Sequence, residues 1–220
     1  VTTCLIDSLT NDVAYTFTVT AHNVVGESTP SAPSPSVTPD VKPNPPGAPV
    51  GTFGDKQVAL TWAAATTDGS PVTSYTVEVS PAVGGTTQQT VQGATSYTWA
   101  GLTNGTAYTF RIQAHNKAPN PSDWSASSQP VVPAGLPFPP AAPNVTKDPV
   151  SALAPAATVA WTAPNGNGDN NFTAYEVRNV GSGATVCSGA WATSCHIVMS
   201  VSTTDQTYQV HAKNKAGWGD

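Results

Sequence analysis

The chain has 220 residues, only 10% of them charged, and its 8 Lys and Arg are outnumbered by 13 Asp and Glu. This balance excludes a positively charged surface for binding nucleic-acid phosphates. No apolar run approaches the roughly 18 residues that membrane insertion of this segment would need. The 21 Pro and 18 Gly, in a background of Thr, Ser, Ala and Val, are typical of an all-β protein with many turns. The length fits about two domains or more.

An internal repeat begins near the start of the chain. Residues 8–23 (SLTNDVAYTFTVTAHN) and residues 101–116 (GLTNGTAYTFRIQAHN) match at 10 of 16 positions with a shift of 93. A third copy follows 98 residues later, where four residues correspond to Phe110, Ile112, Ala114 and Asn116 of the second copy. These four are Tyr208, Val210, Ala212 and Asn214. A fixed period of this kind predicts tandem modules.

Within each copy the apolar residues alternate with polar ones, which predicts half-buried strands. Turn signals such as Asp68-Gly69 and Asn104-Gly105 separate these segments, and no helical periodicity is found. About seven short strands in each repeat, with an early Trp and a late Tyr, predict an immunoglobulin-like β-sandwich.

The residues around the second copy resemble a known family. Trp62, followed by L-x-x-G-x-x-Y-x-F-x-I-x-A-x-N from Leu102, is similar to fibronectin type III modules. The resemblance implies a tyrosine corner, in which the hydroxyl groups of Tyr15 and Tyr108 bond to the backbone just upstream. The third copy departs from this pattern, because Gln206 and Ser200 stand where the Tyr and Leu should be.

The repeat predicts three segments. Residues 1–42 are expected to be the C-terminal part of a truncated module, with only its last three strands, and we call them the first segment. Residues 43–134 are expected to be a complete module, the middle module. Residues 135–220, the third module, are a variant for which the absence of a last strand is left open. Proline-rich linkers from Pro43 and Leu136 predict semi-rigid spacing.

The cysteines indicate whether the chain is in an oxidising or a reducing compartment. Cys187 and Cys195 bracket the sequence CSGAWATSC, a spacing that suits a disulfide between neighbouring extended segments in an oxidising compartment. The alternative is a pair of reduced thiols, and a zinc site would need more ligands than these two and His196. Cys4 is expected to be unpaired, with its partner before Val1.

The sequence contains no motif for catalysis. It has no nucleophile elbow, no P-loop and no H-E-x-x-H, so we expect no enzyme activity and no cofactor. The loop at 165–171 (NGNGDNN) has oxygen-bearing residues in alternation, but it has one carboxylate and lacks the turn glycine of a calcium loop. We therefore expect a polar connecting loop and no metal.

Two groups of residues are candidates for binding. Arg111 and Trp124 are predicted to lie on neighbouring strands and to stack as a cation–π pair. The run from Tyr108 followed by DWSAS resembles the membrane-proximal module of cytokine receptors, although Ala126-Ser127 stands where the Trp-Ser box would be completed. The alternative is that the stacking is purely structural.

The second group lies in loops of the third module that share one end of the predicted sandwich. It comprises Asn167, Asp169, Trp191 and Trp218, and exposed Trp flanked by Asn and Gly is a composition that binding loops use. The alternative is that Trp191 covers the disulfide and Trp218 packs against the linker near Phe138.

Two functions follow from these patterns. The first is non-catalytic binding by a bacterial surface protein, whose composition resembles that of high-GC Gram-positive (actinobacterial, bifidobacterial-like) proteins. Its partner would be another protein such as a host cytokine or matrix protein, and the truncated first module could pair in trans. The alternative is passive spacing in a secreted carbohydrate-active enzyme or a surface stalk. Both place the chain outside the cell, with the signal and anchor elsewhere.

Overall fold

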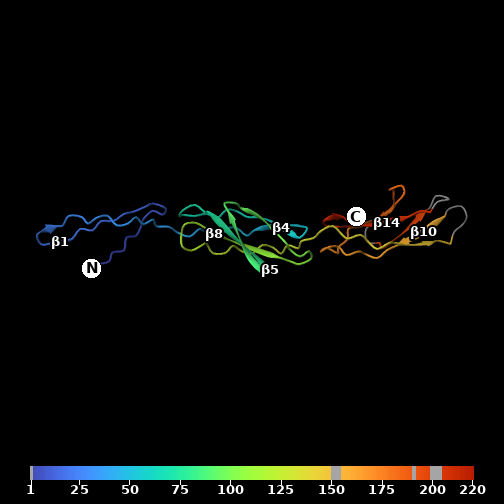
Figure 1. The fold of residues 1–220 in the computed structure, drawn as a ribbon, viewed down its shortest axis with the longest axis horizontal. Coiled ribbons are helices and arrows are strands. Elements are labelled where there is room, and N and C mark those ends of the chain that lie inside the picture. The colour runs from blue at the N-terminus through green and yellow to red at the C-terminus, as the bar shows by residue number, and fades with distance from the viewer. Residues whose placement is uncertain (1, 150–154, 190–191, 199–204) are drawn as a thin grey trace. The chain divides into compact units, whose positions relative to one another are not determined.

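The computed structural model describes residues 2–149, 155–189, 192–198 and 205–220. Over these residues the elements are the strands β1 to β15, all pairing antiparallel where a register is defined, and none is a helix (Figure 1). The all-β prediction is therefore confirmed. Within the same residues, no helix has the length and hydropathy to cross a bilayer.

The chain divides into two compact units, and the division passes through the middle module. The first unit holds residues 1–50, 61–97 and 110–128, and the second holds residues 51–60, 98–109 and 129–220. The sheet β6-β5-β8 of the middle module lies largely in the first unit, whereas most of its sheet β3-β4-β7 lies in the second.

The first segment, in the first unit, has less regular structure than the three strands we expected. Its strands β1 (His22–Asn23) and β2 (Gly26–Glu27) have two residues each, and one isolated bridge joins Tyr15 to Val37. The two sides of this hairpin are nevertheless hydrogen-bonded along their length. The pattern of these hydrogen bonds differs from that of regular strand pairing.

Serine residues in the first segment provide that pattern. Ser31 donates its backbone N–H to the carbonyl of Val19 (3.0 Å), and its Oγ accepts the N–H of Val19 (3.1 Å). Ser28 does the same with Ala21, and Ser34 with Phe17. The serine side therefore advances three residues for every two on the opposite side. Because this spacing breaks the one-to-one register of a β-ladder, the segment is bonded but is not a strand.

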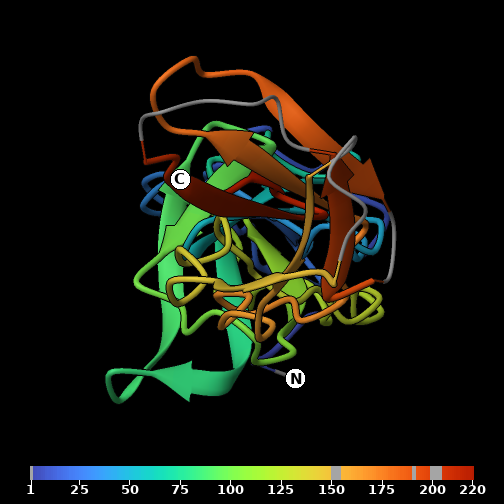
Figure 2. The ribbon, with the colours of Figure 1, turned by 90° about the vertical axis from the view of Figure 1, so that its right-hand side faces the viewer.

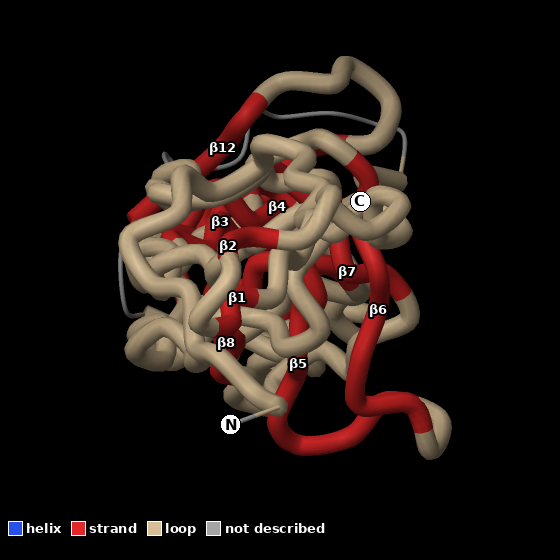
Figure 3. The backbone as a smooth tube through the Cα atoms, turned by 90° about the vertical axis from the view of Figure 1, so that its left-hand side faces the viewer, coloured by secondary structure: helices blue, strands red, loops and turns tan. Residues whose placement is uncertain are grey.

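The first unit also contains the sheet β6-β5-β8, built from β5 (Ser74–Val83), β6 (Thr86–Gln92) and β8 (Thr109–His115). Side chains alternate between buried and accessible along β8, as the period-two pattern predicted. Beyond β8 the serine pattern recurs, because Ser122, Ser125 and Ser128 bond both backbone groups of Ala114, Ile112 and Phe110. This serine segment stands where we expected the last strand of the middle module. Figure 3 shows the strands in red and the remaining backbone in tan.

The second unit begins with the sheet β3-β4-β7, formed by β3 (Val50–Gly54), β4 (Gln57–Thr61) and β7 (Ser96–Ala100). Val58, Leu60 and Trp99 are buried on one face of it. The alternation of these apolar residues with Gln57, Ala59 and Thr61 is the half-buried pattern that a sandwich strand requires.

The third module, in the same unit, has two sheets (Figure 2). One is β13-β10-β9, with β9 (Asn144–Lys147), β10 (Ala156–Ala160) and β13 (Ser194–Val198). The other is β12-β11-β14-β15, with β11 (Ala174–Asn179), β12 (Thr185–Gly189), β14 (Tyr208–Asn214) and β15 (Gly217–Trp218). The largest members of their shared core are Val159, Trp161, Tyr175, Val177, Ile197 and Val210.

The tyrosine corners take the form that the family resemblance implied. The Tyr108 hydroxyl accepts the N–H of Thr103 (3.1 Å), and the Tyr15 hydroxyl accepts the N–H of Thr10 (3.0 Å). In the third module Gln206 accepts a hydrogen bond from the side-chain amide of Asn179 (2.7 Å). Ser200 lies outside the described residues.

Candidate functional site

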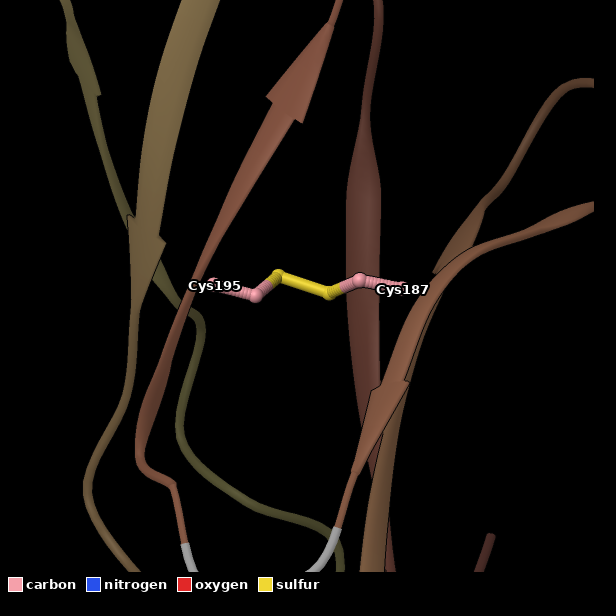
Figure 4. Close-up of a disulfide and its surroundings, with 2 residues drawn as sticks. All are labelled: Cys187 and Cys195. Atoms are coloured by element: carbon pink, nitrogen blue, oxygen red, sulfur yellow. A yellow bond between two sulfur atoms is a disulfide. The ribbon is translucent and has the colours of Figure 1, made fainter.

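The predicted disulfide is present. Cys187 on β12 and Cys195 on β13 are bonded, with their Cα atoms 6.6 Å apart, and the bridge links the two sheets of the third module (Figure 4). Both side chains pack against the core of that module. The alternatives of reduced thiols and of a zinc site are therefore wrong for this pair. Cys4 is a free, exposed thiol.

Arg111 and Trp124 also stack as predicted. The guanidinium carbon lies 4.6 Å from the centre of the indole ring. Arg111 forms an ion pair with Glu78 on β5, and Glu78 accepts a hydrogen bond from the side chain of Gln88 on β6 (3.0 Å). These four side chains form a polar row across the sheet, from β6 to the serine segment.

The charged groups of this row are paired with each other. The hydrogen bond from Arg111 is the largest influence on Glu78 and holds the pKa of its carboxyl below the usual range, although partial burial opposes this shift. The charge of Arg111 is thus neutralised by Glu78, and one face of Trp124 is covered by the guanidinium. The geometry favours the structural alternative, in which the row holds neighbouring strands together.

Asn167 and Asp169 are used inside the second unit. Asn167 takes a left-handed backbone conformation (φ 51°), and its side-chain oxygen accepts a hydrogen bond from Asn104 (2.9 Å). Its carbonyl also accepts the N–H of Gly135, directly before the linker that begins at Leu136 (3.0 Å). Asp169 is buried, and its carboxylate accepts the N–H groups of Asn171 and Lys215. Their polar groups therefore serve the fold.

Asn214, which the sequence placed only in the repeat, is the centre of this arrangement. It is 2% exposed, and its side-chain amide donates to the carbonyls of Gly135 (3.0 Å), Gly166 (2.8 Å) and Asp169 (3.3 Å). It thereby bonds the linker to the Asn-rich loop. We call Asn214 with these partners the distal clamp.

The first unit contains an equivalent clamp around the corresponding residue, Asn116. Its side-chain amide donates to the carbonyls of Val41 (2.8 Å) and Ser70 (3.2 Å), and we call this set the proximal clamp. The N–H of Lys117 is accepted by Ser70, as that of Lys215 is accepted by Asp169. The same residue position in the repeat thus holds the backbone at the start of a linker in both units.

The two remaining candidates differ. Trp218 is 39% exposed, with the Lys213 ammonium 5.7 Å from its ring centre, whereas Trp191 lies outside the described residues. Trp218 and Arg111 fall in different units, and a binding role for each stays a prediction. No set of three His, Cys, Asp or Glu side chains that could hold a metal occurs in the described parts of the chain.

The first segment carries an apolar groove that bears on the predicted pairing in trans. Its volume is about 890 Å³, and Leu9, Phe17 and Val37 are among its lining residues. Most apolar side chains of this segment are exposed, including Val19 at 72%. Pairing through this groove remains a prediction.

Together, the antiparallel sheets with one buried face and the paired tyrosine corners define the immunoglobulin-like β-sandwich class. The comparison with known families is more specific. Residues 44–131, within the middle module, match the family model of the fibronectin type III domain.

Similar proteins include two enzymes. The chain is 37% identical to endoglucanase B of Cellulomonas fimi over 72% of its own length, which is 15% of the length of that enzyme. It is 34% identical to chitinase A1 of Niallia circulans over 73% of its length, or 22% of that enzyme. A solved structure of the chicken CNTN1 FN1–FN3 domains is 19% identical, with a TM-score of 0.42, and covers 94% of this chain and 72% of that one.

The chain thus spans about a fifth or less of the curated relatives it matches. These relatives favour the spacer alternative over the binding of a host protein. The resemblance to cytokine receptors finds no support among them.

Proposed function

We propose that this chain is a non-catalytic spacer within a secreted enzyme that degrades polysaccharides. The observation that carries the proposal is the similarity to an endoglucanase and a chitinase, of which the chain matches only a small part. A module repeated in enzymes with different polysaccharide substrates is more readily explained by a shared mechanical role than by a shared substrate site.

The two clamps support a spacer that holds its linkers in place. Asn116 and Asn214 each fix, by a side-chain hydrogen bond, a carbonyl one or two residues before a proline-rich linker. Prolines already restrict the linker backbone. A linker whose backbone is also hydrogen-bonded to the flanking module keeps the modules at a more constant distance than a flexible linker does.

The disulfide supports a location outside the cell. Disulfides persist in oxidising compartments and are rare in the cytosol. The Cys187–Cys195 bridge joins two sheets and packs against the core, as a structural bridge does. An actinobacterial source remains part of the proposal and rests on composition alone.

A binding assay tests the spacer. The purified chain is mixed with insoluble cellulose and with chitin, and we expect it to remain in the supernatant at the level of a protein that does not bind polysaccharide. Retention on either polymer, lost when Trp124→Ala or Trp218→Ala is introduced, would replace the spacer with a carbohydrate-binding role.

Protein binding is a second candidate, favoured by the exposure of Trp218 beside Lys213. Aromatic residues at the centre of a patch often carry much of the energy of an interface. The same chain immobilised on a sensor surface and exposed to cytokines and matrix proteins tests it. Binding that Trp218→Ala abolishes would support this candidate, and its absence would leave the spacer.

A further inference from the structure

Each unit contains one junction between two successive modules. The first segment meets the middle module in the first unit, and the middle module meets the third module in the second unit. The boundary between the units runs through the middle module and not through a linker. Each junction therefore lies inside one compact unit, and its contacts can be compared with those of the other junction position by position.

At both junctions, the turn just before the corner tyrosine contacts a loop of the next module. In the first unit the side-chain amide of Asn11 donates to the carbonyl of Asp68 (3.1 Å). In the second unit the side-chain amide of Asn104 donates to the side-chain oxygen of Asn167 (2.9 Å). The two donors occupy the same position of the repeat, and so do the two acceptor residues. The same pair of positions therefore joins both pairs of modules.

A glycine in the same loop allows a close approach to the preceding backbone. A Cβ at Gly168 would lie 2.5 Å from the backbone nitrogen of Gly105 and 2.7 Å from the Cβ of Asn104. In the first unit Gly69 occupies the corresponding position, and a Cβ there would lie 2.7 Å from the carbonyl oxygen of Val41. Because any larger residue would collide with that backbone, only glycine permits these approaches without a shift.

A lysine of the later module reaches back to the earlier one at both junctions. Lys117 forms an ion pair with Asp12 of the first segment (2.8 Å). Lys215, at the corresponding position, donates to the carbonyl of Val132 (3.0 Å), and its ammonium lies 4.5 Å from the ring centre of Phe53. The second turn has a glycine where the first has Asp12, so Lys215 contacts other groups of the same earlier module.

We propose that these contacts form one repeated interface between modules, in which the turn before the corner tyrosine docks beside the loop glycine of the next module and fixes their relative orientation. The partner that fits this surface is the next module of the same repeat. Three kinds of contact recur at matching repeat positions, which accidental loop contacts would not do. The clamps hold the start of each linker, whereas this interface joins the folded parts on either side of it. The inference does not rest on the proposed function, because a spacer and a binding protein could both use such an interface.

Residual dipolar couplings of the backbone N–H groups, measured on the full chain, test the orientation. We expect the couplings of the middle and third modules to fit a single alignment tensor in the wild type. Gly168→Ala places a Cβ against the backbone of Gly105 and should force the loop away, so that the two modules need separate tensors. Gly183→Ala is the matched control and should keep a single tensor. Gly183 also has a positive φ (70°, against 96° for Gly168), but nothing lies within 4 Å of its Cβ position.

Two substitutions of Asn167 test the hydrogen bond across the second junction. Asn167→Gly suits the left-handed backbone (φ 51°) and removes the oxygen to which Asn104 donates. We expect it to lower the tensor magnitude of the third module relative to that of the middle module. Asn167→Asp keeps an acceptor oxygen at this position and should behave as the wild type does.

Three results would overturn the proposal. They are wild-type modules that need separate tensors, equal behaviour of Gly168→Ala and Gly183→Ala, and Asn167→Gly and Asn167→Asp variants that cannot be distinguished. Equal behaviour of the two alanine variants would mean that backbone strain, and not contact with the turn of the middle module, governs the orientation. None of these results bears on whether the chain binds polysaccharide, so the spacer proposal is tested separately.

Discussion

Single serine side chains replace part of a β-ladder in this protein. Ser125 is 7% exposed, its Oγ accepts the N–H of Ile112 (2.9 Å) and its own N–H bonds the carbonyl of Ile112. One residue thus satisfies both backbone groups of a buried neighbour. Because a buried N–H without an acceptor is costly, these serines are expected to matter more than surface serines do.

Ser125→Ala tests this expectation. The substitution leaves the N–H of Ile112 without its acceptor and should lower the free energy of unfolding by about 1–3 kcal/mol. Chemical denaturation measures the loss. Ser127→Ala, at an exposed position of the same segment, is the control and should change stability by less than about 0.5 kcal/mol. Equal losses of stability in the two variants would contradict the role of the buried serines in the serine segment.

The charge of Glu78 should make stability depend on pH. Arg111 lowers the pKa of Glu78 in the folded state below its ordinary value of 4.5, so the ionised form stabilises the fold above that pH. This contribution is lost as the pH falls below 4.5 and through the lowered folded-state pKa. The thermal midpoint of the wild type should therefore fall as the solution is acidified.

Glu78→Gln isolates this contribution. The variant should be less stable than the wild type at pH 7, and the difference should shrink as the pH falls below 4.5. Part of the acid sensitivity should remain, because the hydrogen bonds from Ser70 lower the pKa of Asp40 as well. A difference in thermal midpoint that stays constant from pH 7 to pH 3 would rule out the ion pair as its source.

At the scale of elements, the disulfide joins two strands that belong to different sheets. It closes a loop with a sequence separation of 8, and it fixes β12 against β13. The third module has Gln206 in place of the corner tyrosine, so it lacks the hydroxyl contact that Tyr108 makes. The bridge is therefore expected to carry a larger share of the stability of this module.

The double variant Cys187→Ala, Cys195→Ala should be about 2–3 kcal/mol less stable than the wild type, as the loop-closure entropy for this length implies. Urea denaturation with and without reductant measures it. Reductant should destabilise the wild type by a similar amount and leave the double variant unchanged. A wild type that is insensitive to complete reduction would show that the bridge adds nothing.

At the scale of the whole molecule, the linkers are held by the same residue position in both units. Asn116 serves the proximal clamp and Asn214 the distal clamp, 98 positions apart. Asn214 is almost fully buried and bonds three carbonyls, so its removal takes one donor away from each of them. The mobility of the linker should respond to this one side chain.

Asn214→Ala should therefore accelerate amide exchange in the linker. The N–H groups of Gly135 and Phe138 are accepted by the carbonyls of Asn167 and Asn165, and both should exchange at least several-fold faster in the variant. Asn171→Ala, at an exposed position of the same loop, is the control. Unchanged protection of Gly135 in Asn214→Ala would mean that the clamp does not hold the linker.

Much of this protein could be predicted from local pattern. The alternation around Phe110 predicted strand β8, and the spacing of Cys187 and Cys195 predicted their bond. The tyrosine corners were implied by the resemblance to fibronectin type III modules. The stacking of Arg111 on Trp124 was also predicted, because neighbouring strands bring side chains of known direction together. These features follow from the alternation of residues along a strand and from residues on neighbouring strands, which must lie close together.

Other features depended on contacts that the sequence alone does not reveal. The Asn-rich loop resembled an exposed binding loop, yet the left-handed turn at Asn167 and the buried Asn214 direct its polar groups to the linker. The triplet spacing of Ser122, Ser125 and Ser128 is visible in the sequence, but its meaning appears only beside β8.

The sequence by itself therefore determined the all-β class, the repeat and the disulfide, because strand periodicity and cysteine spacing are local properties. Only the tertiary structure decided which polar residues face other parts of the chain, since that depends on partners tens of residues away. It also decided that β6 is left as an open edge while β8 is covered by serines. The reason is that partners and open edges follow from the order of the strands in each sheet, which no local sequence pattern encodes.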